Sequence, residues 1–415
     1  MLDQGQTLKT RFGRKLVIER LLDTGGQAEI YLTKDLKTGR LTVLKKFHHQ
    51  FAPRPTVERI QFLIAQRFPD ACPEILAPFD LIENKKFVAH LTDYADGQSL
   101  EEHLVTTKNT LKENILIAME LTRIMAELHR RGIAHGDLHA YNIRIRKNGA
   151  GYVLYLIDLD NYYCDGVAPP PMIGQRLYLA PELQVAMEQD QPALPDIFTE
   201  LFALGILIHE IVLLKHIAAG ADADEQQFLK AMYQGHWLHD PANAEHPLVN
   251  PGGYPVKILN AELARYFRLA LSHDRDRRTT AEQWHRALEN TLDNIHVCSH
   301  CGGDCIIDAS KIQCPFCGRP YPALQLRVNG TIIDLQESGI MVGRANLNGT
   351  PLVSMNHAVF RRIGPQTWME SVGRNGTWRW SGSQWIRLPD KKPVLVQKND
   401  QLKFADLEVT VCEIV

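Results

Sequence analysis

The chain has 415 residues, of which 45% are hydrophobic and 23% charged, and its formal net charge is −2. This length is typical of two to four domains, and the composition is that of an ordinary globular protein. The nearly balanced charge excludes a strongly basic nucleic-acid binder, so we expect no nucleic-acid partner. A net charge near zero does not exclude a local basic patch.

Neither secretion nor membrane insertion is expected. Residues 1–15 lack the apolar stretch of a secretory signal. The most apolar run, Leu201 to Leu214, is short and contains His209 and Glu210, so it predicts a buried helix rather than a membrane span. Of eight cysteines, four form two CxxC pairs, which favours a metal site in a reducing compartment over a disulfide framework. We expect a cytoplasmic protein without a membrane partner.

Three sections of the chain differ in composition. Residues 13–292 combine a strand-rich start with long helical stretches, residues 295–321 are rich in Cys, Gly and Pro, and residues 322–415 alternate apolar runs with turns. We therefore expect a multidomain α+β protein with these three domains. Near the start, three runs between turns are predicted as strands: Leu16–Arg20, Ile30–Thr33 and Leu41–Phe47. Thr110, three residues before Glu113, predicts a capped helix that ends near Gly132.

Four segments of the first section follow one another in a fixed order: LLDTGGQAEIYL, TVLKKF, IAHGDLHAYNIRI and YLIDLDNYY. Farther along stand LYLAPEL, ELFALGILIHE and DRDRRTTAEQW. Together they resemble the signature set of eukaryotic-like protein kinases over roughly residues 13–292. The resemblance implies a bilobal protein-kinase-like domain that uses ATP and Mg²⁺ to phosphorylate a protein substrate, with serine or threonine as the expected acceptor.

The resemblance assigns the nucleotide site to the first two segments and to a helix. Gly25 and Gly26 would cover the phosphates, because a backbone without side chains can approach them closely. Lys45, rather than its neighbour Lys46, would bind the α- and β-phosphates. Glu58, in TVERIQFL, would pair with Lys45.

It assigns the chemistry to the third and fourth segments. Asp137 would orient the attacking hydroxyl or accept its proton. Asp158 and Asn142 would supply the carboxylate and amide oxygens that Mg²⁺ prefers. Arg278 would be the buried partner of Glu182 and hold the substrate-binding lobe together.

Some positions depart from the family pattern. Gly136 replaces the arginine that binds a phosphorylated activation segment, and no Ser or Thr lies between Asp158 and Glu182. We therefore expect that Ser/Thr phosphorylation of this segment does not switch the kinase on. His139 replaces the usual lysine, and Asp160 replaces the glycine that follows the metal-binding aspartate by two residues, which predicts a stiffer segment.

The second section pairs CSHC with CPFC, placing Cys298, Cys301, Cys314 and Cys317 at the spacing of a zinc ribbon. Four thiolates leave no open position on Zn²⁺, so we expect a structural metal that stabilises a segment too short for its own core. Cys305 is expected to be a bystander.

The third section contains GIMVGRANLNG, LVSMNHAVF, SVGRNGTW and KNDQLKF, which together resemble the all-β FHA sandwich. The resemblance implies that Arg344 and Ser354 hold a phosphothreonine phosphate, since arginine bonds two phosphate oxygens at once. His357 would brace the loop, and Asn375 would bond to the peptide backbone. The partner is then a phosphothreonine protein.

The whole pattern resembles bacterial kinases of intracellular signalling or stress response, and an associated phosphatase and a von Willebrand-type protein are further expected partners. Two alternatives stay open. The altered glycine loop, with Asp23 and Ala28 in place of glycines, suits a pseudokinase scaffold that binds nucleotide and phosphopeptide without transfer. HGDLH also occurs in small-molecule phosphotransferases.

Overall fold

The computed structural model describes residues 1–51, 54–149, 151–169, 174–191, 193–217, 237, 239–240, 253–292, 294–298, 300–307, 313–320, 324–335, 340–363 and 366–414. The chain divides into two compact units. The first comprises Met1–Val256 and Glu262–Asp293, and the second comprises Lys257–Ala261 and Asn294–Val415. Short 3₁₀ turns join several elements: η1 His49–Phe51, η2 Ala140–Asn142, η3 Leu159–Asn161, η4 Arg176–Tyr178, η5 Val256–Ile258 and η6 Arg275–Arg277.

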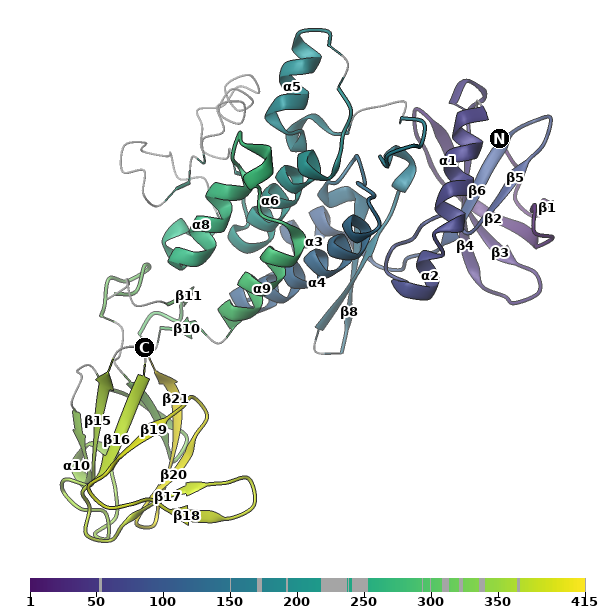
Figure 1. Ribbon diagram of the computed structural model, residues 1–415. Coiled ribbons are helices and arrows are strands. Elements are labelled where there is room, and N and C mark those ends of the chain that lie inside the picture. Colours follow the sequence, from purple (N-terminus) through teal and green to yellow (C-terminus); the bar gives the residue numbers. More distant parts are fainter. Residues whose placement is uncertain are drawn as a thin grey trace. The chain divides into compact units, whose positions relative to one another are not determined.

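The first unit begins with an antiparallel sheet of strand order β1-β2-β3-β4-β6-β5 (Figure 1). Its strands are β1 Thr7–Lys9, β2 Lys15–Thr24, β3 Ala28–Asp35, β4 Leu41–Phe47, β5 Asp80–Glu83 and β6 Val88–Asp93. Helices α1 (Arg54–Ala65) and α2 (Phe68–Ala71) follow β4. One face of α1 is apolar and packs against the sheet, with Val57 and Ile60 beside Phe47 and Leu81. The three predicted strands are confirmed within β2, β3 and β4.

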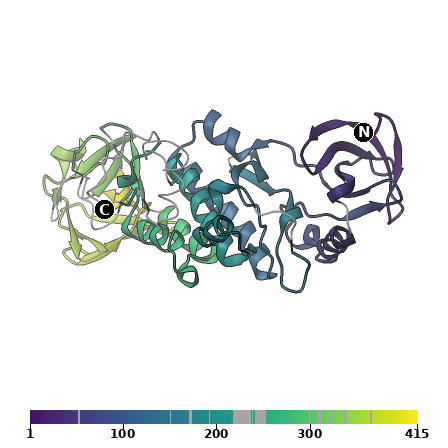
Figure 2. The same ribbon diagram turned by 90° about the horizontal axis from the view of Figure 1, so that it is seen from above.

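The remainder of the first unit is mainly helical, and the sheet lobe and the helical lobe are separate in both views (Figure 2). Its helices are α3 Leu100–Thr106, α4 Leu111–Arg130, α5 Pro181–Glu188, α6 Ile197–Leu213, α8 Ala261–Ala270 and α9 Ala281–Leu292. A small sheet joins β7 Gln98–Ser99, β8 Ile143–Asn148 and β9 Gly151–Leu156. The predicted cap of α4 is confirmed, since the Thr110 hydroxyl accepts from the Glu113 amide at 3.2 Å and the Glu113 carboxylate accepts from the Thr110 amide at 2.8 Å.

The apolar run at Leu201–Leu214 lies mostly in α6, where nearly every residue is buried, as its composition predicts. Among the described residues, no helix combines the length and the apolar character needed to cross a bilayer.

In the described part of the second unit, nearly all of the regular secondary structure is strand. β10 (Ile295–Val297) pairs with β11 (Asp304–Ile306). Beyond them lie two sheets, of order β13-β12-β21-β20-β17-β18 and β14-β15-β16-β19. Their elements are β12 Leu324–Val328, β13 Thr331–Leu335, β14 Ile340–Val342, α10 Arg344–Leu347, β15 Ala358–Ile363, β16 Gln366–Ser371, β17 Thr377–Trp380, β18 Trp385–Arg387, β19 Pro393–Val396, β20 Gln401–Phe404 and β21 Leu407–Ile414. Both sheets contribute to one apolar core, which contains Phe360 and Met369 from one and Phe404 and Val409 from the other.

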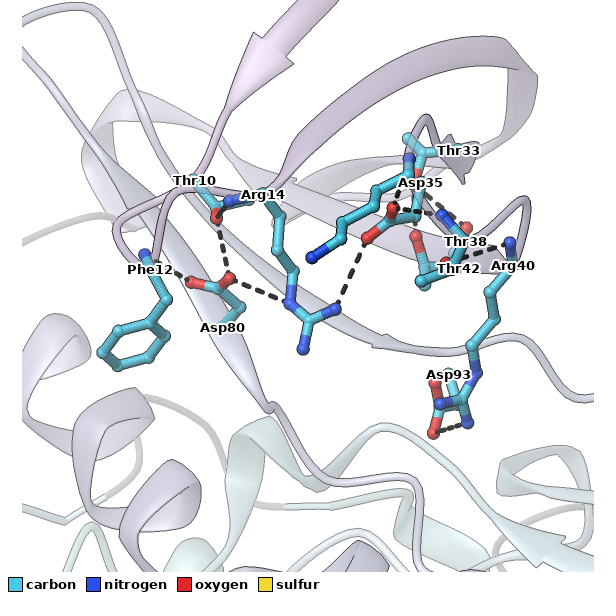
Figure 3. A network of polar contacts seen from close by, with 11 residues as sticks. Thr10, Phe12, Arg14, Thr33, Asp35, Thr38, Arg40, Thr42, Asp80 and Asp93 are labelled. Atoms are coloured by element: carbon cyan, nitrogen blue, oxygen red, sulfur yellow. Dashed lines mark hydrogen bonds and ion pairs between the residues drawn. The ribbon is translucent and has the colours of Figure 1, made fainter.

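A polar network stabilises the edge of the first sheet (Figure 3). Asp80, at the start of β5, is fully buried. Its carboxylate accepts from the Thr10 hydroxyl at 2.7 Å and lies 3.5 Å from the Arg14 guanidinium. Arg14 also reaches Asp35 at 3.4 Å. The carboxylate of Asp80 therefore joins the segment before β2 to a strand far away in the sequence.

We expect Asp80→Ala to lower the free energy of unfolding by about 2 kcal/mol, because it leaves the buried Thr10 hydroxyl without its acceptor and leaves Arg14 with Asp35 alone. Thermal and urea unfolding measure the change. The matched control is Glu83→Ala on the same strand, whose carboxylate is 51% exposed and 3.9 Å from Arg11. The control is expected to stay within about 0.5 kcal/mol of the wild type. Equal effects of the two substitutions would contradict the role given to Asp80.

Candidate active site

β4 presents two lysines to opposite sides of the sheet. The Lys45 ammonium forms an ion pair with Asp158, the second residue after β9. The Lys46 ammonium instead lies 2.7 Å from the carboxylate of Glu29. Asp158 adopts a positive φ of 62°, a conformation that aspartate tolerates better than most residues. Residues in such sparsely populated backbone conformations cluster at functional sites. Of the two lysines, Lys45 is therefore the one beside the predicted metal ligand.

The loop between α4 and β8 brings together Asp137 and Asn142. The Asn142 amide nitrogen donates to the Asp137 carbonyl at 2.9 Å and lies 3.0 Å from the His139 ring nitrogen. The Asp137 carboxylate accepts from the Gln175 amide at 2.9 Å and lies 3.5 Å from His139. Burial raises the pKa of Asp137, but the hydrogen bond and the charge of His139 outweigh burial, so the net pKa lies below its usual value. The carboxylate is ionised and can accept a proton.

Contacts with α6 fix the backbone of this loop. Glu200, on α6, accepts from the Gly136 amide at 3.0 Å and lies 2.7 Å from His129. Gly136 has a φ of +77°, and a Cβ there would lie 2.1 Å from the carbonyl oxygen of Asn161. A side chain, including the arginine of the family pattern, cannot occupy this position without moving the loop. The departure noted in the sequence therefore has a steric cause.

The predicted pair of Glu182 and Arg278 is confirmed. Two guanidinium nitrogens of Arg278 donate to the two carboxylate oxygens of Glu182, each at 2.7 Å. The Arg278 side chain is fully buried, and it also donates to the Phe198 carbonyl at 2.9 Å. A bidentate pair of this kind fixes the start of α5 against α6.

The predicted pairing of Lys45 with Glu58 is wrong. The Glu58 carboxylate is 57% exposed and accepts from Arg54, one turn earlier on α1, at 3.0 Å. The buried positions of the helix include Val57 and Arg59, which places Glu58 on the solvent-facing side. The residue next to it, Arg59, points inward instead.

Gly25 and Gly26 form the turn between β2 and β3. The Gly25 amide donates to the Ala28 carbonyl at 2.9 Å, which closes the turn. A Cβ on Gly26 would meet no atom within 4 Å, so open space adjoins the backbone here. Neither glycine has a positive φ, so the backbone conformation of the turn does not require glycine. Close approach of a bound group, such as a phosphate, would require it.

The model of the protein kinase domain matches residues 16–287, about two thirds of the chain. The chain belongs to the protein kinase family. This match supports the prediction of a protein kinase enzyme, and it agrees with the two-lobed first unit and with the residues gathered between the lobes.

Bacterial serine/threonine kinases are among the relatives of this kinase domain. A probable serine/threonine-protein kinase of Streptomyces coelicolor is 26% identical over 49% of the chain and 31% of the relative. Serine/threonine-protein kinase pkn2 of Myxococcus xanthus is 25% identical over 46% of the chain and 24% of the relative. PrkC of Bacillus subtilis is 24% identical over 49% of the chain and 31% of the relative. The matched part of the chain spans between a quarter and a third of the length of these relatives.

A kinase domain implies ATP and Mg²⁺, and the residues between the lobes fit them. Both contacts of the Asn142 side chain use its nitrogen, so the amide oxygen is the atom left for a cation. The Asp158 carboxylate is 38% exposed and would supply a second oxygen ligand. Lys45 would face the phosphates from β4. These three side chains would hold the metal and the nucleotide on the side of Asp137.

Outside the kinase domain, the four predicted cysteine ligands lie together: Cys298, Cys301, Cys314 and Cys317. Their sulfur atoms all lie within 4.8 Å of one another, and two pairs are 3.8 and 3.7 Å apart. Zn–S bonds of about 2.3 Å in a tetrahedron require sulfur atoms about 3.8 Å apart. The glycine after each CxxC pair has a positive φ, 71° and 69°, as expected for two equivalent knuckles: Gly302 and Gly318. The cluster therefore fits Zn²⁺.

The four residues predicted to bind phosphothreonine lie around the loop between α10 and β15. Arg344 donates to the carbonyls of Val353 at 2.9 Å and Pro351 at 2.6 Å, and Asn375 donates to Leu352 at 2.6 Å. All three contacts fix the loop, and Asn375 is itself exposed.

Ser354 and His357 continue this arrangement. The Ser354 hydroxyl accepts from the Arg374 amide at 3.0 Å. His357 is fully buried, accepts from the Ser354 amide at 3.2 Å and lies 2.9 Å from the Gly376 carbonyl. Burial lowers its pKa, so the imidazole is neutral near pH 7 and acts as a brace within the fold.

Glu210 makes part of the kinase domain sensitive to pH. Burial raises its pKa to about 8, with the charge of Glu101 adding to burial and the hydrogen bond from Tyr178 at 2.8 Å opposing it. A carboxyl group whose pKa is raised in the folded state contributes its full stabilisation at pH values below its pKa in the unfolded chain, which is 4.5. That stabilisation is lost as the pH rises through the folded-state pKa of about 8.

We therefore expect Glu210→Gln to raise the melting temperature of the kinase domain at pH 8.5 by a few degrees and to change it little at pH 4.5. Melting curves of wild type and variant between these pH values measure the difference. A constant difference across the range would show that ionisation of Glu210 is not its cause.

Proposed function

We propose that the chain is an ATP- and Mg²⁺-dependent protein kinase that transfers the γ-phosphate to serine or threonine. One observation carries the proposal. Lys45, Asp158, Asn142 and Asp137 come from three separate segments: Lys45 pairs with Asp158, Asn142 is bonded to Asp137, and the Asn142 carbonyl accepts at 2.9 Å from the amide of Ile157, the neighbour of Asp158. A structural ion pair of Lys45 with Asp158 would not by itself require a second carboxylate and an amide on the loop that is bonded to the backbone beside Asp158.

Each residue would have a distinct role. Asp158 and the amide oxygen of Asn142 would hold Mg²⁺, which supplies charge neutralisation on the phosphates when bound. Lys45 would fix the phosphates by their negative charge. Asp137, ionised and held by the Gln175 amide, would orient the acceptor hydroxyl and take its proton.

Transfer of labelled γ-phosphate from Mg·ATP to the protein itself and to a generic protein substrate tests the proposal, with Asp158→Asn for comparison. Label on the wild type and none on the variant supports a protein kinase. ATP binding without transfer would favour the scaffold alternative. ATP consumption that depends on an added metabolite rather than on protein would favour a small-molecule phosphotransferase.

We propose further that the β-sandwich of the second unit is an FHA domain that binds a phosphothreonine protein. Support comes from the loop held by Arg344 and Asn375, beside which the Ser354 hydroxyl meets a backbone amide. Guanidinium, hydroxyl and amide together suit a phosphate dianion. Tethering such a domain to a kinase raises the local concentration of a phosphorylated partner. An associated phosphatase and a von Willebrand-type protein stay predictions.

Binding of threonine peptides and their phosphorylated forms to the full chain tests the second proposal. We expect Arg344→Ala to weaken phosphopeptide binding by about tenfold or more, since a charge-assisted bidentate contact contributes about 1.5–3 kcal/mol. Arg361→Ala is the control, because Arg361 lies on a strand surface beside Glu370 at 3.7 Å. A wild type that does not distinguish phosphorylated from unmodified peptide would refute the proposal.

A further inference from the structure

Lys45 has a second carboxylate partner that the family pattern does not supply. Its ammonium lies 2.7 Å from Asp160, two residues beyond Asp158, and the two side chains are 11% and 10% exposed. The other oxygen of Asp160 lies 3.0 Å from His90, the residue directly opposite Lys45 on β6. Asp160 is therefore held from two sides and bridges β4 and β6 to the segment after β9.

The charges around Lys45 agree with this pairing. Burial opposes the charge of Lys45, but the attraction of Asp160, and then of Asp158, outweighs it and raises the pKa of the lysine. With Mg²⁺ bound, Asp158 would share its carboxylate with the dication, and Asp160 would remain as the carboxylate beside the lysine. A buried ammonium without such a partner would be costly.

Helix α1 supplies a cation where the resemblance predicts a glutamate. The Arg59 guanidinium, 5% exposed as a residue, donates to the Asp160 carbonyl at 2.9 Å and also to the carbonyls of Tyr162 and Ala168. It stacks over the Tyr162 ring at 4.1 Å, and the Tyr162 hydroxyl returns a hydrogen bond to the Arg59 carbonyl at 3.0 Å. α1 is thus attached to the backbone of the segment that carries Asp158.

We infer that Asp160 replaces the helix glutamate as the carboxylate that positions Lys45. We also infer that α1 carries Arg59 in place of that glutamate, and that the hydrogen bonds of Arg59 attach the helix to the activation segment. The inference rests on the proposed kinase function and deepens it. Asp160 is a positioning residue, since it acts on the nucleotide through Lys45.

The exchange has a consequence for regulation. In the family pattern the partner of the lysine lies on the helix, so a shift of the helix separates the pair. Here the partner of Lys45 follows Asp158 on the same short segment, and Arg59 ties α1 to that segment. The pairing therefore persists without phosphorylation, in agreement with a segment that contains no Ser or Thr and whose Tyr162 is fully buried.

A charge-exchange series tests the inference, with kcat and KM for ATP measured on Asp160→Asn, Asp160→Gly, Arg59→Glu and the double variant Arg59→Glu/Asp160→Gly. We expect each single variant to lose about ten- to a hundredfold in kcat, because misplaced reacting groups cost about this much. The double variant, which restores the family arrangement, is expected to recover at least about tenfold over Arg59→Glu. Glu58→Gln, next to Arg59 but facing solvent, is the matched control and is expected to equal the wild type.

Asp160→Asn keeps the shape of the side chain and guards against a folding defect in the glycine variant. The inference is overturned if Asp160→Asn retains wild-type kcat, or if the double variant is no more active than the product of the single effects. If the wild type itself transfers no phosphate, the proposed function fails separately. The pairing is then decided by the affinity for a fluorescent ATP analogue, which Asp160→Asn should weaken and the double variant should restore.

Discussion

Replacing Asp137 with asparagine is expected to lower kcat for phosphate transfer by about 10²–10⁴-fold, with little change in the affinity for Mg·ATP. Asparagine keeps the shape of the side chain and can still accept the hydrogen bond from the Gln175 amide. It cannot take up the proton that the acceptor hydroxyl loses. Asp137 does not touch Lys45 or Asp158, so nucleotide binding should be unaffected. Initial rates and the affinity for a fluorescent ATP analogue measure the two effects.

Asp165→Asn is the control for this prediction, because it makes the same chemical change at an exposed residue that meets only the Tyr163 hydroxyl among the contacts described, at 3.0 Å. It should leave kcat unchanged. An Asp137→Asn variant within about threefold of the wild type would show that Asp137 is not the base.

Loss of one cysteine ligand is expected to have the second large effect. Cys314→Ser should reduce the bound zinc from about one ion per chain to almost none, because three thiolates no longer close the tetrahedron. Structural zinc supplies about 10–16 kcal/mol to modules that have little apolar core, so we expect the β10–β11 pair and the two cysteine knuckles to unfold. Metal analysis and proteolysis of the full chain measure loss of the ion and of the fold.

Cys412→Ser is the control, since Cys412 lies on β21 outside the sulfur cluster. It should retain zinc and resist proteolysis like the wild type. A wild-type chain purified without chelators that contains no zinc, or a Cys314→Ser variant that keeps it, would contradict the assignment.

Local patterns predicted the framework of the protein well. The Thr110–Glu113 pair placed the start of α4 because a capping box depends on neighbouring residues only. The alternation of apolar runs and turns in residues 322–415 predicted a strand-rich section, and Asn329 and Gly330 have the positive φ of the turn that joins β12 to β13. The CxxC spacing likewise identified the sulfur cluster, since each pair forms its own knuckle.

Pairs that are distant in the sequence were harder to predict. The prediction for Glu58 failed because successive side chains of an α-helix are turned by about 100° relative to one another, so that Arg59, and not Glu58, lies on the inner face of α1. Asp160 appeared only as an unusual residue at a glycine position. Its role depends on Lys45 and His90, which meet it only after the sheet and the activation segment come together.

A crystal structure of the full chain with Mg²⁺ and a non-hydrolysable ATP analogue tests the central claim most directly, namely that Lys45, Asp137, Asn142 and Asp158 form one phosphoryl-transfer site. We predict phosphates against Lys45, Mg²⁺ on the oxygens of Asp158 and Asn142, and the terminal phosphate facing Asp137. Nucleotide bound elsewhere, or bound in the cleft with no metal on Asp158, would contradict the claim.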